Sequence, residues 1–172
     1  YSVAVDISSE QGQALIKEIA LTTDVVIENY KAGSLAKYGL DYASLSELNP
    51  NIVYCSITGF GQNGPRAEEP GYDFIIQGMS GLMSITGEKE ELSESGAQKV
   101  GVAVVDIQTG LYATVAIQAA LLARYHTGRG QYIDMSLLDV QVATLANQGM
   151  NYISSGVAPK RMGNSHSNIV PY

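Results

Sequence analysis

Two aspartates draw attention because each stands among uncharged neighbours at the predicted start of a helix. Asp73 follows Gly71 and Tyr72, and Asp106 follows an apolar run at residues 102–105. A carboxylate with a basicity set by apolar burial against a helix dipole is suited to attack an activated acyl group as a covalent nucleophile. An aspartate in this position is also an ordinary N-cap, and Asp106 would then bond the backbone N–H of Thr109. Spacing alone favours the N-cap, and local chemistry does not separate the two interpretations.

Residues 59–64 match the G-x-G-x-x-G pattern of dinucleotide-binding loops and follow a predicted strand. In that motif the third glycine opens a helix, whereas here Pro65 and the acidic Glu68 and Glu69 follow. Two carboxylates would stand where a pyrophosphate should sit. A glycine-rich turn is therefore favoured, and no NAD cofactor is expected.

Other nucleophile and metal patterns are weak. Residues 78–82 miss the Gly-x-Ser-x-Gly nucleophile elbow by one position. Cys55 lies in a predicted strand and is favoured as a small buried apolar residue. His126 fits the C-terminal turn of a helix, where the dipole favours a cation, and His166 is an isolated loop residue. This set has no zinc-ligand spacing, so no metal is expected, and the single cysteine favours a reducing compartment.

The composition describes one folded domain of ordinary size. The chain has 172 residues, of which 45% are hydrophobic and 16% charged. Its 17 acidic and 10 basic side chains give a net charge of −7, which argues against nucleic acid as a partner. The apolar stretch at 111–123 is shorter than the roughly 20 residues of a membrane span and is expected to be a core helix, so no membrane association is expected. With no secretory signal at the first residues, the cytoplasm is the expected location.

The first half of the chain predicts strands that alternate with helices. Apolar and β-branched runs predict strands at residues 2–7, 24–28 and 51–57. Helices are expected from a capping box at Ser8 to about Leu21, and at 34–38 and 42–48, the last after Asp41 as N-cap.

A glycine- and proline-rich loop at 58–71 separates these elements from the second half of the chain. Helices are then expected at 72–85, 106–127 and 137–154, with an acidic loop at 87–99, a strand at 131–135 and Ser136 capping the last helix. This order predicts an α/β fold with a mostly parallel sheet and helices on both faces.

Taken together, these segments resemble the family III CoA-transferases, also called the CaiB/BaiF family, over essentially the whole chain. The blocks that carry the resemblance are DVVIENY at 24–30, GSL at 33–35, LNPNIVY at 48–54, GFGQNGP at 59–65, GYD at 71–73, DIQTG at 106–110 and TGRGQ at 127–131. Seven blocks in the family's order make chance similarity very improbable.

The resemblance implies a covalent mechanism on Asp106, which matches the family's nucleophilic aspartate. Asp106 would attack a donor acyl-CoA such as succinyl-CoA to form a mixed anhydride, and the CoA thiolate would convert the anhydride to an aspartyl-CoA thioester. A carboxylic acid acceptor would then take the CoA by the reverse sequence. Asp73 would be a second carboxylate that tunes the charge of Asp106 or positions the acyl group.

The resemblance also assigns CoA contacts to Asn29, Tyr30, Lys37 and Tyr38. Tyr30 would offer an adenine-stacking face. Lys37 stands where an arginine is common in the family, so it keeps the positive charge for CoA phosphates without the bidentate geometry.

Tyr72 bears on the reaction type. The α-methylacyl-CoA racemase branch has a histidine at this position, whereas a tyrosine with a pKa near 10 is a poor acid or base at neutral pH. Transfer is therefore favoured over racemisation, and a non-catalytic acyl-CoA-binding module is a third hypothesis. Residues 161–168 lack the glycine run of formyl-CoA transferase, which favours succinyl-CoA, glutarate or related dicarboxylates, with a carnitine-type substrate also open.

Family members are considerably longer, with a large Rossmann-like domain, a small domain and an interlocked homodimer. By resemblance, residues 1–155 would be a partial large-domain core and 156–172 a linker that enters the small domain. The isolated chain is expected to be inactive.

Overall fold

A computed structural model describes residues 1–171, which form two compact units. The first, here called the sheet unit, comprises Tyr1–Pro70 and Leu111–Met135. The second, here called the aspartate unit, comprises Gly71–Gly110 and the chain from Ser136 onward. The predicted boundary between a domain core at 1–155 and a linker at 156–172 stays a prediction.

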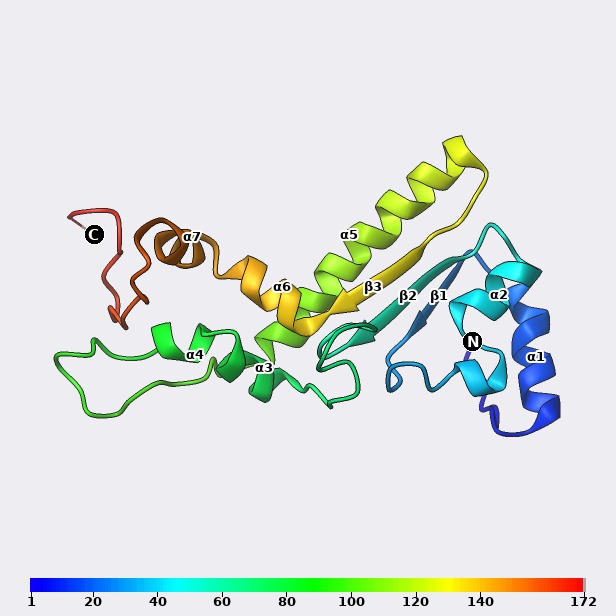
Figure 1. Cartoon of the computed structure of the whole chain (residues 1–172), viewed down its shortest axis with the longest axis horizontal. Helices are drawn as coiled ribbons and strands as arrows, with labels where there is room; N and C mark the ends of the chain where they lie inside the picture. Colours follow the sequence, from blue (N-terminus) through cyan, green and yellow to red (C-terminus); the bar gives the residue numbers. More distant parts are fainter. Residues whose placement is uncertain (172) are drawn as a thin grey trace. The chain divides into compact units, whose positions relative to one another are not determined.

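The sheet unit is built on three strands in the order β1, β2, β3 (Figure 1). These are β1 (Val25–Glu28), β2 (Val53–Thr58) and β3 (Tyr132–Ser136). β1 and β2 are parallel, with Val25 opposite Val53 and Glu28 opposite Ser56. The α/β fold with a mostly parallel sheet is confirmed, and all three strands lie within a residue or two of their predicted positions. β1 and β2 are short, mainly apolar runs, as is typical of strands covered on both faces.

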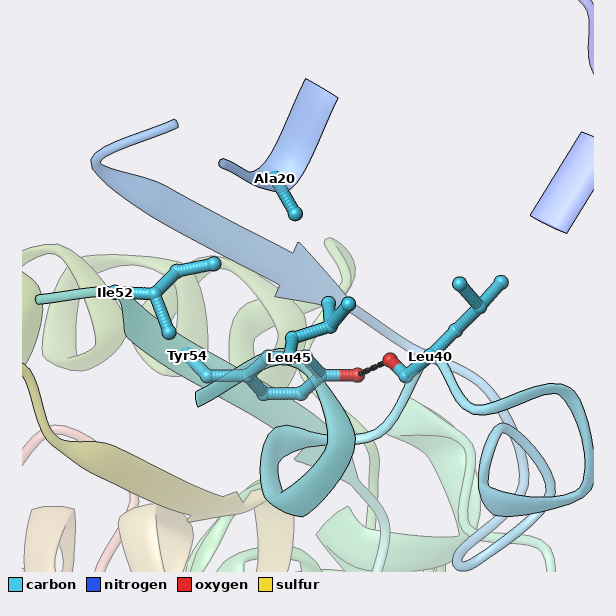
Figure 2. Close-up of a cluster of buried hydrophobic side chains, with 5 residues drawn as sticks. All are labelled: Ala20, Leu40, Leu45, Ile52 and Tyr54. Carbon is cyan, nitrogen blue, oxygen red and sulfur yellow. Dashed lines mark hydrogen bonds between the residues drawn. The ribbon is translucent and has the colours of Figure 1, made fainter. Parts of the chain in front are cut away.

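The core of the sheet unit forms where β2 meets α1 (Glu10–Ala20) and α2 (Tyr42–Leu48). Figure 2 shows Tyr54 among Ala20, Leu40, Leu45 and Ile52, with its hydroxyl donating a 2.8 Å hydrogen bond to the carbonyl of Leu40. Each large apolar side chain buried here stabilises the fold by about 1.5–3 kcal/mol. Val53 and Cys55, on the opposite face of β2, are also fully buried, so both faces of this strand are covered.

The beginning of the chain differs from the prediction. Residues 2–7 form no strand, because no neighbouring strand among the described residues offers them a hydrogen-bond ladder. Asp6 instead organises a turn, in which its carboxylate accepts the N–H of Ser8 at 2.9 Å. The cap of α1 is Ser9, one residue later than predicted, and its hydroxyl accepts the N–H of Gly12.

The aspartate unit is helical. It contains α3 (Asp73–Met79), α4 (Leu82–Ile85), α6 (Leu137–Thr144) and α7 (Ala146–Ser155). The single helices predicted at 72–85 and 137–154 are each broken once, at Gly81 with φ of 90° and at Ala146 with φ of 49°. A left-handed residue cannot continue a right-handed helix, and glycine adopts that conformation without the Cβ clash.

Helix α5 (Val104–Thr127) is shared by the two units, with residues up to Gly110 in the aspartate unit and those from Leu111 in the sheet unit. It begins two residues before the predicted start at Asp106. α5 is long and apolar enough to cross a membrane, but the core helices of water-soluble proteins can be equally long and apolar. Of its most apolar stretch, 22% is buried. The expectations of a core helix and of no membrane association stay predictions. Near its C-terminal end, Arg124 binds Asp24 at 2.7 Å and donates to the carbonyl of Asn51.

Candidate active site

Asp106 lies inside the first turn of α5, as its third residue, with an exposed side chain. The interpretation of Asp106 as an N-cap is therefore wrong. The helix starts earlier because Val104 and Val105 already have helical geometry, and the N–H of Ile107 bonds the carbonyl of Ala103. No described residue donates a hydrogen bond to the Asp106 carboxylate, so its oxygens are open to a reacting group.

The capping role belongs to Asp73, which acts on α5 and not on its own helix. One carboxylate oxygen of Asp73, Oδ1, accepts the backbone N–H of Val105 at 2.8 Å and that of Asp106 at 3.4 Å. The first N–H groups of a helix have no partner within the helix, and a negative charge there is favoured by the helix dipole. Asp73 thus fixes the backbone from which the Asp106 side chain projects.

Gln77 holds the other oxygen of Asp73. Its Nε2 donates a 2.7 Å hydrogen bond to Asp73 Oδ2, and its Oε1 accepts the backbone N–H of Val100 at 2.8 Å. Gln77 is fully buried, and it lies one helical turn after Asp73 on α3. Both aspartates predicted as site residues are therefore brought together in one hydrogen-bonded arrangement with a glutamine that the sequence analysis missed.

The electrostatics of this pair make Asp106 more basic. Partial removal from water raises the pKa of Asp106 above its ordinary value, and the negative charge of Asp73 raises that pKa further. A carboxylate with a raised pKa is a stronger base and a better nucleophile. The arrangement is suited to covalent acyl chemistry on Asp106.

Tyr72 directly precedes Asp73 and is the N-cap residue of α3, where its side chain makes no capping hydrogen bond. The residue is 71% exposed. Phe74 and Ile107, next to the two carboxylates in sequence, are also exposed apolar side chains. Exposed apolar side chains thus adjoin both aspartates along the chain.

The four residues predicted to contact CoA lie in the sheet unit. Asn29 and Tyr30 come just beyond the carboxyl end of β1, and Lys37 and Tyr38 lie in the short 3₁₀ helix η1 (Ala36–Tyr38), within the helix predicted at 34–38. The Nδ2 of Asn29 donates to the carbonyl of Ile57 at 2.6 Å, and the N–H of Tyr30 donates to the Glu28 carboxylate at 2.7 Å. Tyr30 and Lys37 are exposed, and the Lys37 ammonium lies 4.6 Å from the centre of the Tyr38 ring. This end of a parallel sheet is where α/β proteins bind ligands.

A cavity of about 270 Å³ opens beside the same segment. Its walls include Glu28, Lys31 and the stacked rings of Tyr42 and Tyr132, while none of the four predicted CoA contacts lines it. The hydroxyl of Ser34, also in its wall, is buried and bonds no described residue.

The glycine-rich loop that follows β2 is held in place by hydrogen bonds within the protein. The N–H of Gln62 donates to the Asp134 carboxylate and that of Gly61 to the Thr58 hydroxyl, both at 2.9 Å. The next helix starts only at Asp73, so the strand–loop–helix context of a dinucleotide fingerprint is missing. This geometry disfavours a pyrophosphate at the loop, and the absence of an NAD cofactor stays a prediction.

Cys55 and the two histidines lie outside this arrangement. Burial raises the pKa of the Cys55 thiol to about 11, which disfavours the thiolate needed of a nucleophile. The ring of His166 accepts the N–H of Asn168, and His126 packs edge-on against Tyr125. Within residues 1–171 no three His, Cys, Asp or Glu side chains are placed to hold a metal ion.

The sequence analysis missed two residues with positioning contacts, Gln77 beside the aspartate pair and Asp134 at the glycine-rich loop. For Gln77 a signal existed, since Asp and Gln four residues apart on one helix face can hydrogen-bond and a glutamine among apolar helix positions needs a partner. For Asp134 no local signal existed, because its partner Gln62 is 72 residues away along the chain.

Comparison with known proteins gives consistent relatives. The sequence model of CoA-transferase family III matches residues 1–172. A succinate–glutarate CoA-transferase from Agrobacterium fabrum is 58% identical over 99% of the chain and 42% of the relative. A succinyl-CoA:glutarate CoA-transferase from Mus musculus is 46% identical over 99% of the chain and 38% of the relative. The chain thus spans about two-fifths of the length of the curated relatives it matches.

A solved structure agrees. The crystal structure of a CAIB/BAIF family protein from Brucella suis superposes with a TM-score of 0.92 at 56% identity, covering 99% of this chain and 44% of that one.

Proposed function

Because the chain belongs to CoA-transferase family III, we propose that the full-length protein containing it transfers CoA from an acyl-CoA donor to a carboxylic acid through a covalent intermediate on Asp106. The observation that carries the proposal is the pair of aspartates. Asp106 presents an open carboxylate of raised pKa, while Asp73 fixes the backbone beneath it.

The reaction consists of four displacements that balance without any added proton or oxidant. A carboxylate oxygen of Asp106 attacks the thioester carbonyl of the donor, the C–S bond breaks, and CoA leaves as thiolate. The thiolate attacks the Asp106 carbonyl of the mixed anhydride, which releases the donor acid as a carboxylate and leaves an aspartyl-CoA thioester. The acceptor carboxylate then displaces the thiolate, which attacks the acceptor acyl group and frees Asp106.

We propose CoA contacts by Asn29, Tyr30, Lys37 and Tyr38. The position of this segment just past the carboxyl end of β1 supports the proposal. Lys37 provides an exposed positive charge for a phosphate, and the exposed Tyr30 ring provides a stacking face. Asn29 donates one of its two amide N–H groups to Ile57, so its second N–H and its carbonyl oxygen are left to meet the ligand.

The proposed substrates are succinyl-CoA as donor and glutarate or a related dicarboxylate as acceptor. Relatives at 58% and 46% identity are named for succinate or succinyl-CoA and glutarate, whereas a relative from Acetobacter aceti named as an acetyl-CoA:oxalate CoA-transferase is 36% identical. The graded identity supports the longer dicarboxylates.

Assembly, location and the activity of the isolated chain belong to the same proposal. We expect the full-length protein to be an interlocked homodimer in the cytoplasm, and residues 1–172 alone to be inactive. Turnover by the isolated polypeptide at the rate of the full-length protein would contradict the last point.

The decisive experiment traps the intermediate. Full-length protein is incubated with succinyl-CoA, with and without hydroxylamine, and its peptides are analysed by mass spectrometry beside Asp106→Asn. The expected result is a CoA adduct, or a hydroxamate after hydroxylamine, on the Asp106 peptide of the wild type alone.

A matched control is available in Asp139→Asn. Asp139 is an exposed aspartate and the third residue of α6, as Asp106 is of α5. This control should label like the wild type. Binding of CoA without any adduct across several acyl-CoA donors would instead favour the racemase or the non-catalytic binding module.

A further inference from the structure

Gln77 is the only glutamine of α3, and the structure dictates which way its amide points. Asp73 Oδ2 can only accept a hydrogen bond and the backbone N–H of Val100 can only donate one, so Nε2 must face Asp73 and Oε1 must face Val100. The amide joins the carboxylate that caps α5 to the segment just before that helix. With 0% of its surface exposed, Gln77 has no water to replace either bond.

We propose that Gln77 is a positioning residue for the covalent step, an inference that rests on the proposed function of Asp106. By holding Asp73 Oδ2, Gln77 keeps Asp73 Oδ1 under the N–H groups of Val105 and Asp106. The nucleophile projects from the same peptide units. Gln77 therefore sets the orientation of a carboxylate that it does not itself touch.

The physical reason is geometric. Without the Gln77 amide, the Asp73 side chain loses one of its anchors and can rotate away from α5. The first turn of α5 then loses its external hydrogen-bond acceptor, and the backbone that carries the Asp106 side chain is no longer held in place. A misplacement of about 1 Å at a reacting group can slow a reaction about a hundredfold.

The hydrogen-bond pattern offers a test by exchange of donor and acceptor. In Asp73→Asn, the new amide nitrogen faces the Gln77 amide nitrogen, and two donors oppose each other. In Gln77→Glu, two carboxylates oppose each other. When both substitutions are combined, the introduced asparagine would keep its oxygen toward Val105 and donate to the introduced glutamate. That glutamate would still accept from Val100, so that every bond is restored.

The experiment measures the rate of Asp106 acylation by succinyl-CoA in the full-length protein. The variants are Gln77→Leu, Gln77→Glu, Asp73→Asn and the double Asp73→Asn/Gln77→Glu. Gln141→Leu is the matched control, because Gln141 is also a buried glutamine of the aspartate unit and its Oε1 accepts from no described residue. Deuterium exchange of the peptide covering residues 100–106 is followed in parallel as a readout that does not depend on activity.

Gln77→Leu should acylate at least about tenfold more slowly at saturating succinyl-CoA, with a much smaller change in the donor concentration for half-maximal rate. Its exchange at residues 100–106 should be faster, and the double variant should react faster than either single variant. Gln141→Leu should behave as the wild type.

Three results would overturn the inference. These are a wild-type rate for Gln77→Leu, a double variant no faster than the better single variant, and unchanged deuterium exchange in all variants. If Gln77→Leu does not fold, the comparison of the double variant with Asp73→Asn decides. Failure of the proposed function looks different, since wild type would then show no label on Asp106 while deuterium exchange still responded to Gln77.

Discussion

The carboxylate of Asp73 accepts the backbone N–H of Val105 at 2.8 Å across 32 residues of sequence. The first residue of one short helix thereby caps the long helix that carries Asp106. Structure and chemistry meet in this contact, because the group that stabilises the start of α5 also places a negative charge near the nucleophile and raises its pKa.

Replacement of Asp73 by alanine should destabilise the protein by about 1–2 kcal/mol, the usual loss when a helix cap is removed. Two backbone N–H groups and the Gln77 amide lose their acceptor together. Thermal unfolding of the full-length variant measures the effect. Asp41→Ala is the control, because Asp41 precedes α2 but accepts no backbone N–H of that helix, and it should lose distinctly less. Equal losses would contradict the capping role.

Asp106→Asn should leave the protein as stable as the wild type at neutral pH, or slightly more stable. The pKa of Asp106 is raised in the folded state, so its carboxyl group favours folding below its unfolded pKa, and that contribution is lost as pH rises through the folded pKa. Asparagine carries no such charge. Because Asp106 is exposed and screened by water, the gain should stay within about 0.5 kcal/mol.

The pH dependence is the sharper part of this prediction. The stability difference between Asp106→Asn and wild type should shrink as the pH falls and Asp106 becomes protonated. Denaturant unfolding at several pH values tests it. If the stability of Asp106→Asn relative to the wild type instead increases as the pH falls, the pKa of Asp106 is not raised in the folded state.

Cys55 should be inert toward alkylating reagents in the folded protein. With a pKa of about 11 against an ordinary 9.0, its thiolate is about a hundredfold scarcer at pH 8, and the side chain is fully buried. Iodoacetamide at pH 8, followed by mass spectrometry of the Cys55 peptide, should show modification only in urea. Rapid labelling without denaturant would show that the sheet unit opens at β2.

Gly130→Ala should be strongly destabilising, by about 3 kcal/mol. A Cβ at this position would overlap the carbonyl oxygen of Ile52, where the chain passes against the start of β2. Gly110→Ala is the control, because a Cβ on this residue of α5 meets nothing within 4 Å. Alanine should there stabilise the helix by about 0.5–1 kcal/mol. Two melting temperatures that shift in the same direction would contradict the prediction.

Much of the fold could be predicted because its signals are local. The strands β1 and β2 are mainly apolar runs bounded by polar residues, and Ser136 caps α6 as expected by accepting the N–H of Asp139. The breaks at Gly81 and Ala146 were missed because apolar spacing continues across each of them. Residues 2–7 have the composition of a strand, but a strand also requires a neighbour, which composition does not reveal.

The candidate site was predicted only in its residue types. Asp73 and Asp106 stand out locally, but the cap on α5 comes from a residue distant in sequence, and no spacing rule links the two. The prediction that Asp106 is the N-cap of α5 failed because nothing in the types of Val104 and Val105 indicates that the helix has already begun at these residues. The proposed role of Asp106 comes from the resemblance to the family, whereas the contacts of Asp73 and Gln77 that position it are visible only in the structure.

The packed tyrosines of the sheet unit provide an intrinsic spectroscopic signal of folding. Tyr42 and Tyr132 stack at 5.1 Å between ring centres, and Tyr54 lies 6.0 Å from Tyr132. The chain has 11 tyrosines and no tryptophan, so no indole drains or masks their emission. Near-ultraviolet circular dichroism and tyrosine fluorescence would therefore report the packing of these three rings without any label, on top of the signal of the chain's eight other tyrosines.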